Sequence, residues 1–256
     1  MIHPLAPLAG AAAGLIAGSF LGLVAARWPR GEQVLLGRSH CDDCGRALGP
    51  SELIPLVSYM VQRGRCRHCG APISPSAPLF EVLAAVVGAL VFAIAETPLA
   101  FTWLMFGWAL LLLAALDLSH FWLPDRLTLP LAAAGLMVGA AKGALLLSLI
   151  GAAVGWAALV ILGAMYRGAR GREGLGGGDP KLLAAIGAWL GPGALPVVLL
   201  IGAVSGLVAA GILKLRGHEI GSGTALPFGV FLVVGAAGFL CVTALSGAVS
   251  FAIPTP

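Results

Sequence analysis

The stretch Phe101–Leu118, FTWLMFGWALLLLAALDL, is apolar or small at nearly every position. It is long enough to cross a bilayer as a helix, and its one charged residue, Asp117, stands next to its end. A charged side chain within a membrane costs about 2 to 4 kcal/mol and therefore marks chemistry or transport. We expect a transmembrane helix that ends on a functional carboxylate.

A second aspartate follows a glycine-rich turn further along the chain. The sequence Gly176-Gly177-Gly178-Asp179 opens another apolar stretch. Two carboxylates brought together can share one proton, so that one acts as acid and the other as base. Such a pair would activate a water molecule against a peptide bond, provided that the rest of the chain brings Asp117 and Asp179 to the same place.

Composition decides the broad class of the protein. The chain has 256 residues, of which 59% are hydrophobic and 10% charged, and its mean hydropathy is +0.99. An ordinary soluble domain carries about 25% charged residues. The 37 glycines suit close packing of helices in lipid. We therefore predict an all-α polytopic membrane protein embedded in the lipid bilayer.

Apolar runs of roughly 20 residues predict about eight transmembrane helices, with both termini outside. The expected spans are 5–26, 78–95, 99–118, 127–141, 144–166, 180–195, 196–213 and 225–250. The segment 180–195 is interrupted by Gly191-Pro192-Gly193 and is short for a crossing, so it either spans the membrane or forms a re-entrant hairpin.

The distribution of positive charge predicts the orientation of these helices, because loops rich in Lys and Arg face the cytoplasm. Seven arginines fall between residues 27 and 77, and the later polar breaks that carry positive charge alternate with breaks that carry almost none. These basic residues are Arg27, Arg30, Arg38, Arg46, Arg63, Arg65 and Arg67, then Arg126, then Arg167, Arg170 and Arg172, then Lys214 and Arg216. This pattern places Asp117, Asp125 and Asp179 at the cytoplasmic face of the membrane. It divides the chain into a first helix (1–26), a cytoplasmic loop (27–77) and a membrane-embedded catalytic part (78–256).

Two C-x-x-C-G turns lie in the cytoplasmic loop, between the first and second helices. Cys41 and Cys44 form one pair, Cys66 and Cys69 form the other, and 21 residues separate the pairs. Four thiolates from two tight turns supply a closed tetrahedral site, and thiols in the cytoplasm stay reduced. We predict a structural zinc ion bound by the four cysteines. The alternative, a redox-active pair of C-x-x-C motifs, would need these cysteines on the oxidising side of the membrane. Cys241, alone in the last apolar run, is expected to be a small buried hydrophobic residue.

Taken in order, these motifs resemble those of the prepilin peptidases, or type IV leader peptidases, which are intramembrane aspartyl proteases of bacteria. The resemblance runs over nearly the whole chain and departs from the family pattern at Gly22, at Asp42-Asp43 and at Pro180. The matching stretches are Gly18–Leu21, the paired C-x-x-C loop, Ile54–Tyr59, Arg63–Cys66, Pro78–Glu81, Asp117-Leu118, Leu123–Pro130 and Gly174–Leu182.

The resemblance implies an activity and the residues that carry it. The two catalytic aspartates of the family match Asp117 and Asp179. The implied reaction is removal of short basic leaders from type IV prepilins or pseudopilins at the cytoplasmic face of the bacterial inner membrane. Many members then methylate the new N-terminal residue with S-adenosylmethionine, and residues 27–77 are the expected methyltransferase region, with unknown donor-binding residues. A peptidase without methyltransferase activity is the alternative.

The residues around the two aspartates suggest their roles. Asp117 ends a helix, where the helix dipole and apolar surroundings favour a neutral acid, whereas Asp179 begins one, where the charged base is favoured. A helix cap is the plain alternative for Asp179 and the preferred reading for Asp125. We expect Lys181 to be an interfacial anchor. Glu81 is either a favourable first-turn charge or a substrate contact.

An ion-coupled transporter is the competing class of function, because membrane aspartates also carry protons. That class predicts acids near the bilayer midplane and related halves of the chain. Here the acids share one face, and the cysteine loop holds the only repeat in the sequence. No feature of the sequence indicates a nucleic-acid partner.

Overall fold

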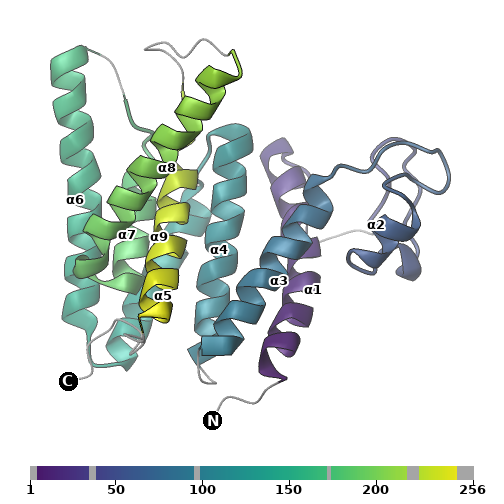
Figure 1. Ribbon diagram of the computed structural model, residues 1–256, viewed down its shortest axis with the longest axis horizontal. Coiled ribbons are helices and arrows are strands. Elements are labelled where there is room, and N and C mark those ends of the chain that lie inside the picture. Colours follow the sequence, from purple (N-terminus) through teal and green to yellow (C-terminus); the bar gives the residue numbers. More distant parts are fainter. Residues whose placement is uncertain (1–4, 35–38, 95–98, 172–173, 218–224, 247–256) are drawn as a thin grey trace. The chain divides into compact units, whose positions relative to one another are not determined.

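The computed structural model describes residues 5–34, 39–94, 99–171, 174–217 and 225–246. Within these ranges the chain consists of α-helices, short 3-10 helices and turns, with two isolated β-bridges and no β-strand (Figure 1). The expected all-α class is confirmed. The chain divides into two compact units, residues 1–112 and 113–256, whose boundary falls within helix α4 (Leu99–His120).

The N-terminal unit is organised around two closely packed helices. Its elements are α1 (Ala6–Arg27), η1 (Trp28–Arg30), η2 (Pro50–Glu52), α2 (Val57–Val61), α3 (Ser76–Ile94) and the first part of α4. A stripe of glycines at every fourth position of α1 faces α3. A Cβ atom at Gly10 would overlap the carbonyl oxygen of Gly88, and one at Gly14 would overlap that of Ala84. The two backbones are in direct contact, as is usual for helices that pack in a membrane.

The C-terminal unit is centred on a short buried helix. It contains the end of α4, α5 (Asp125–Ala141), α6 (Leu145–Arg170), α7 (Asp179–Leu190), η3 (Pro192–Ala194), α8 (Leu195–Leu215) and α9 (Phe228–Leu245). Helix α7 packs against α5 and α6, and ten of its residues are buried. Trp189 of α7 donates a hydrogen bond from Nε1 to the carbonyl oxygen of Leu131 in α5, at 2.8 Å.

Five helices of the described chain are long and apolar enough to cross a membrane. They cover Ala6–Arg30, Ser76–Ile94, Ala100–His120, Leu145–Arg170 and Pro192–Leu215. Helix α5 has 17 residues, and the apolar helix Phe228–Ala244 is also shorter than the five. The expected count of eight crossings therefore stays a prediction. Arg38, Arg172 and residues 247–250 of the last expected span lie outside the described ranges.

The expected break near Gly191 is confirmed. Helix α7 ends at Leu190, and Gly191 adopts φ +77°, a conformation that favours glycine. With 12 residues, α7 is about 18 Å long, which is too short for a hydrocarbon core of about 30 Å. Pro180 stands within its first turn, where a missing backbone N–H costs little.

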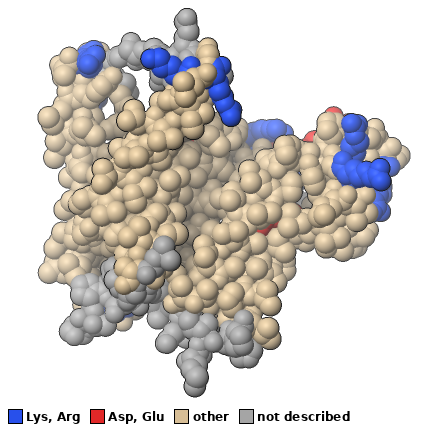
Figure 2. Space-filling view, in the orientation of Figure 1, with Lys and Arg blue, Asp and Glu red and all other residues tan. Residues whose placement is uncertain are grey.

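The surface of the molecule is largely apolar, with its positive charges gathered in a few places (Figure 2). In the C-terminal unit, α6 and α8 end in basic turns that contain Arg167, Arg170 and Lys214. Both helices end, and α9 begins, toward the same end of this unit (Figure 1). Cys241 is exposed on α9, so the expectation that it is buried was wrong. In a membrane protein an apolar side chain need not lie inside the protein, because lipid surrounds it as well.

Candidate active site and candidate metal centre

Asp117 is held at the junction of two helices. It lies in the last turn of α4, and only 5% of its surface is exposed. Its Oδ2 atom accepts a hydrogen bond of 3.0 Å from the backbone N–H of Val230, in the first turn of α9. The first N–H groups of a helix have no partners within that helix. The start of α9 therefore supplies a donor that stabilises a negative charge on Asp117.

The close approach of α9 to Asp117 depends on a glycine. A Cβ atom at Gly229 would lie 2.8 Å from Oδ2 of Asp117 and 3.0 Å from Cδ1 of Leu123. Any larger residue at this position would push the carboxylate or the helix away.

Asp179 is the first residue of α7 and is also buried, with 4% of its surface exposed. The N–H of Gly176 donates to its Oδ2 atom at 2.9 Å, while the N–H of Asp179 donates to the carbonyl oxygen of Gly176 at 3.2 Å. These two bonds close the glycine-rich turn on the carboxylate. The N-cap position of α7 is Gly178, and the side-chain hydrogen bond of Asp179 is to Gly176, which precedes the helix.

The structure brings the two aspartates within electrostatic reach of each other. Burial, followed by the charge of Asp117, raises the pKa of Asp179 to about 6, although the hydrogen bond from Gly176 acts in the opposite direction. Leu123 lies between the two backbone segments that hold the acids. A Cβ atom at Gly178 would come within 2.6 Å of its Cβ atom, and Leu123 also contacts Gly229. The side chain of Leu123 thus packs against both the turn before Asp179 and the start of α9.

Asp125 and Lys181 form an ion pair with each other. The Lys181 Nζ atom donates to both carboxylate oxygens of Asp125, at 2.6 and 2.8 Å. Asp125 is the first residue of α5, directly after Pro124 at the N-cap position. The pair joins the start of α5 to the start of α7, two residues after Asp179. The sequence indicated a helix cap at Asp125 and an interfacial anchor at Lys181, and it did not indicate this contact between them.

Sequence reasoning missed the contribution of α9. The available signal was the Pro227-Phe228-Gly229 triplet that opens the last apolar run, since proline and glycine mark a helix start and a close backbone approach. The expected roles of the aspartates rested on the direction of α4 and α7 and on the apolar surroundings of Asp117. With α9 in place, both carboxylates lie at the N-terminal ends of helices, so the helix dipoles no longer distinguish Asp117 as the neutral partner.

The four cysteines of the N-terminal unit come together as predicted. Their sulfur atoms all lie within 4.8 Å of one another, and those of Cys41 and Cys69 are 3.8 Å apart. A tetrahedral zinc site with Zn–S bonds of about 2.3 Å places its sulfurs about 3.8 Å apart. The donor set and its spacing fit a closed structural site with no open position for catalysis.

The two C-x-x-C turns have the same backbone structure. Gly45 and Gly70 donate their N–H groups to the carbonyl oxygens of Cys41 and Cys66, both at 2.9 Å, and both glycines have positive φ. Each turn is closed by an isolated β-bridge. The sequence repeat is therefore a structural repeat, and each copy contributes two of the four sulfurs.

Glu81 belongs to the N-terminal unit and is buried, with 7% of its surface exposed. It is the sixth residue of α3 rather than a first-turn residue. Its Oε2 atom accepts a hydrogen bond of 2.7 Å from the N–H of Leu56, which has positive φ. Glu81 therefore fastens the loop before α2 to α3.

Comparison with known proteins adds an independent observation. Residues 12–95 match a family described as the bacterial peptidase A24 N-terminal domain, and residues 104–211 match the type IV leader peptidase family. No solved structure matches the chain.

Similar proteins named prepilin leader peptidase/N-methyltransferase occur in several bacteria. The chain is 42% identical over 207 residues to that of Burkholderia pseudomallei (strain K96243), which covers 79% of this chain and 66% of the relative. It is 41% identical over 209 residues to that of Aeromonas hydrophila, covering 78% and 70%. It is 34% identical over 263 residues to that of Pseudomonas aeruginosa, covering 91% and 89%. The match to the Burkholderia relative thus spans just under two thirds of that protein's length.

Proposed function

The chain belongs to the prepilin leader peptidase/N-methyltransferase family, and on that premise we propose that it cleaves the leader peptide from type IV prepilin or pseudopilin precursors. The observation that carries the proposal is the pair Asp117 and Asp179, two buried carboxylates of one compact unit whose charges interact. Each accepts a backbone hydrogen bond that fixes its position.

The chemistry is general acid–base hydrolysis of a peptide bond. The oxygen of a water molecule attacks the scissile carbonyl carbon while a charged aspartate takes one of its protons, and the protonated aspartate donates a proton to the carbonyl oxygen. Collapse of the tetrahedral intermediate breaks the C–N bond: the leaving amine takes the proton from one aspartate, and a hydroxyl of the intermediate gives its proton to the other, which restores the shared proton.

We assign the resting proton to Asp179 and the charge to Asp117, the reverse of the roles expected from sequence. The N–H of Val230 supports a charged Asp117, and that charge favours protonation of Asp179. The two carboxyl groups titrate as a unit, so the assignment describes the dominant arrangement of one shared proton.

The location of the pair suits a substrate with a polar basic leader and an apolar helix. Asp117 contacts the start of α9, toward the end of the C-terminal unit at which α6 and α8 carry basic residues. Basic ends face the cytoplasm, so we place the cut at the cytoplasmic face of the bacterial inner membrane, in a multi-pass protein. The substrate helix would stay in the lipid while its leader reaches the acids from the cytoplasm.

The second part of the proposal is methylation of the new N-terminal residue. The relatives are named for both activities, and this chain contains the four-cysteine module within its match to the N-terminal domain family. We propose that the module binds zinc and that S-adenosylmethionine supplies the methyl group. The amine lone pair forms the new N–C bond, the S–C bond breaks toward sulfur, and the amine loses one proton.

Cleavage of a prepilin by the purified protein in detergent tests the peptidase. Wild type is expected to cut, whereas Asp117→Asn and Asp179→Asn are expected to lose cleavage while keeping the thermal unfolding temperature of wild type. Lys142→Gln, outside the site, serves as a control that should cut normally. If all variants cut alike, the active site lies elsewhere. Mass measurement of the product with and without S-adenosylmethionine then tests methylation separately.

A further inference from the structure

A pocket of about 490 Å³ lies in the N-terminal unit, between the cysteine module and the membrane helices of that unit. Its walls come from the end of α1, the first C-x-x-C turn, η2, α2, the second turn and the start of α3. Ligand pockets for small molecules have volumes of about 300 to 1,000 Å³. The pocket is therefore of a size that admits a nucleoside-sized molecule.

One buried carboxylate oxygen in this wall has no hydrogen-bond partner. Glu52 is buried, with 4% of its side chain exposed. Its Oε2 atom accepts from the N–H of Gly49 at 2.8 Å and from Arg46 at 3.4 Å, but Oε1 has no partner. A charged acceptor without a donor is costly to bury. A donor, and most favourably a cationic one, would relieve this cost.

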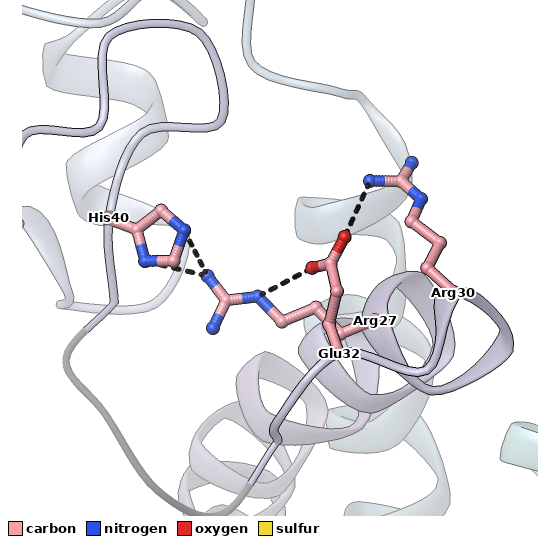
Figure 3. Close-up of polar contacts among 4 residues, drawn as sticks. All are labelled: Arg27, Arg30, Glu32 and His40. Atoms are coloured by element: carbon pink, nitrogen blue, oxygen red, sulfur yellow. Dashed lines mark hydrogen bonds and ion pairs between the residues drawn. The ribbon is translucent and has the colours of Figure 1, made fainter.

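A positive charge is built into the same pocket. Arg27, at the end of α1, lines it and is buried, with 7% of its surface exposed. Figure 3 shows its guanidinium between two partners: Nε faces Glu32 at 3.9 Å and Nη2 contacts the ring of His40 at 3.3 Å. Glu32 also faces Arg30 at 4.0 Å. Glu32 itself is no part of the pocket wall.

A buried acceptor and a buried guanidinium in one cavity select a ligand that carries both a cation and an anion. We propose that this pocket is the binding site of the methyl donor, with Glu52 accepting from its ammonium group and Arg27 supplying positive charge for its carboxylate. This inference rests on the methyltransferase part of the proposed function. It identifies the pocket that Glu52 and Arg27 both line as the donor site.

The affinity of the protein for S-adenosylmethionine tests this proposal without any measurement of catalysis. Radiolabelled S-adenosylmethionine is dialysed to equilibrium against the full-length, zinc-loaded protein in detergent, with no prepilin present. Wild type should bind saturably. Glu52→Gln removes the charge and should weaken binding at least about tenfold, because a buried charged partner is lost. The matched control Glu32→Gln makes the same change outside the wall and should stay within about twofold of wild type.

A second variant keeps the test decisive if Glu52→Gln loses its zinc or fails to fold. Ser58→Trp fills the pocket from α2 without changing any charge, and it should abolish donor binding while zinc content is unchanged. Asp117→Asn, in the other unit, should bind the donor as wild type does.

Several results would overturn the inference. If the wild-type protein cleaves prepilin but does not bind S-adenosylmethionine, the proposed donor site is wrong and the proposed peptidase activity is still supported. Unchanged binding by Glu52→Gln means that the free oxygen holds only a structural water molecule. Glu52-dependent binding of a processed pilin peptide, in place of the donor, would assign the pocket to the substrate amine instead. Failure of the peptidase itself would be seen separately, as absence of cleavage by wild type.

Discussion

The shared proton of the two aspartates sets the pH range of the peptidase. The pKa of Asp179 is raised from 3.8 to about 6, so the pair keeps a proton below that pH and loses it above. We predict that kcat/KM for prepilin cleavage falls as the pH rises through about 6 toward about 8, because the acid is then missing. Measuring kcat/KM across this pH range, with thermal unfolding checked at each pH, tests the prediction. A rate that climbs over the same interval would contradict the prediction.

The charge of Asp117 is one cause of that raised value. In the Asp117→Asn variant the neighbouring charge is gone, so the pKa of Asp179 should fall toward its ordinary value. The carboxyl infrared band of the remaining acid, followed as a function of pH, reports this directly. An unchanged pKa would mean that burial alone raises it.

The ion pair between Asp125 and Lys181 is predicted to position α7 rather than to stabilise the fold. Its side chains are 53% and 37% exposed, and exposed pairs contribute about 1 kcal/mol or less. Lys181→Met should therefore change the thermal unfolding temperature little but lower kcat about tenfold, because Asp179 lies two residues away. The exchanged pair Asp125→Lys/Lys181→Asp should recover part of kcat. An exchange no better than the single variant would argue against positioning.

Residue identities were the part of the site most accessible to sequence. That Asp117 and Asp179 come together, and that the four cysteines cluster, could be predicted because a charge in an apolar run, or a thiol pair at fixed spacing, has few explanations. The partners of these residues could not be. The N–H of Val230, the side chain of Leu123 and the link from Asp125 to Lys181 all depend on contacts between distant segments.

Helix packing in this protein relies on places where two backbones touch. A Cβ atom at Gly187 of α7 would overlap the carbonyl oxygen of Gly151 in α6. We predict that Gly187→Ala destabilises the protein by about 1 to 3 kcal/mol through overpacking. Gly211→Ala, in α8 where an added Cβ meets nothing, should instead stabilise the helix by about 0.5 to 1 kcal/mol. The free energies of unfolding of the two variants can be compared by thermal or denaturant unfolding in detergent. Equal shifts in the same direction would contradict the prediction that the contact between Gly187 and Gly151 matters for stability.

Most helices could be placed from apolar runs to within a few residues, as α1 (Ala6–Arg27) and α4 (Leu99–His120) show. Hydropathy could not show that α7 is the buried centre of its unit, since buried and lipid-facing helices have similar composition. The same ambiguity explains the error at Cys241. In a membrane protein, an apolar side chain can face either lipid or another helix, so its hydropathy does not show whether it is buried within the protein.

At the scale of the whole molecule, we predict that the cysteine loop of the N-terminal unit needs bound metal to stay folded. Cys44→Ser removes one of the four sulfur ligands and should abolish bound zinc and open the loop of residues 39–75 to protease, while most helical circular dichroism is kept. Cys241→Ser, far from the cluster in sequence and outside it, is the matched control and should keep its zinc. A Cys44→Ser protein that retains full zinc would show that the cluster is not the binding site.

The placement of Leu123 between Gly178 and Gly229 has a consequence for how this protein can evolve. Three positions from three separate stretches of chain share one small volume, so a larger residue at 178 or 229 would press on Leu123, and at 229 on Asp117 as well. Substitutions there should arise together or not at all. Across natural variants, residues 123, 178 and 229 should therefore covary as a triplet, a signature that mutual information in a deep collection of related sequences would reveal.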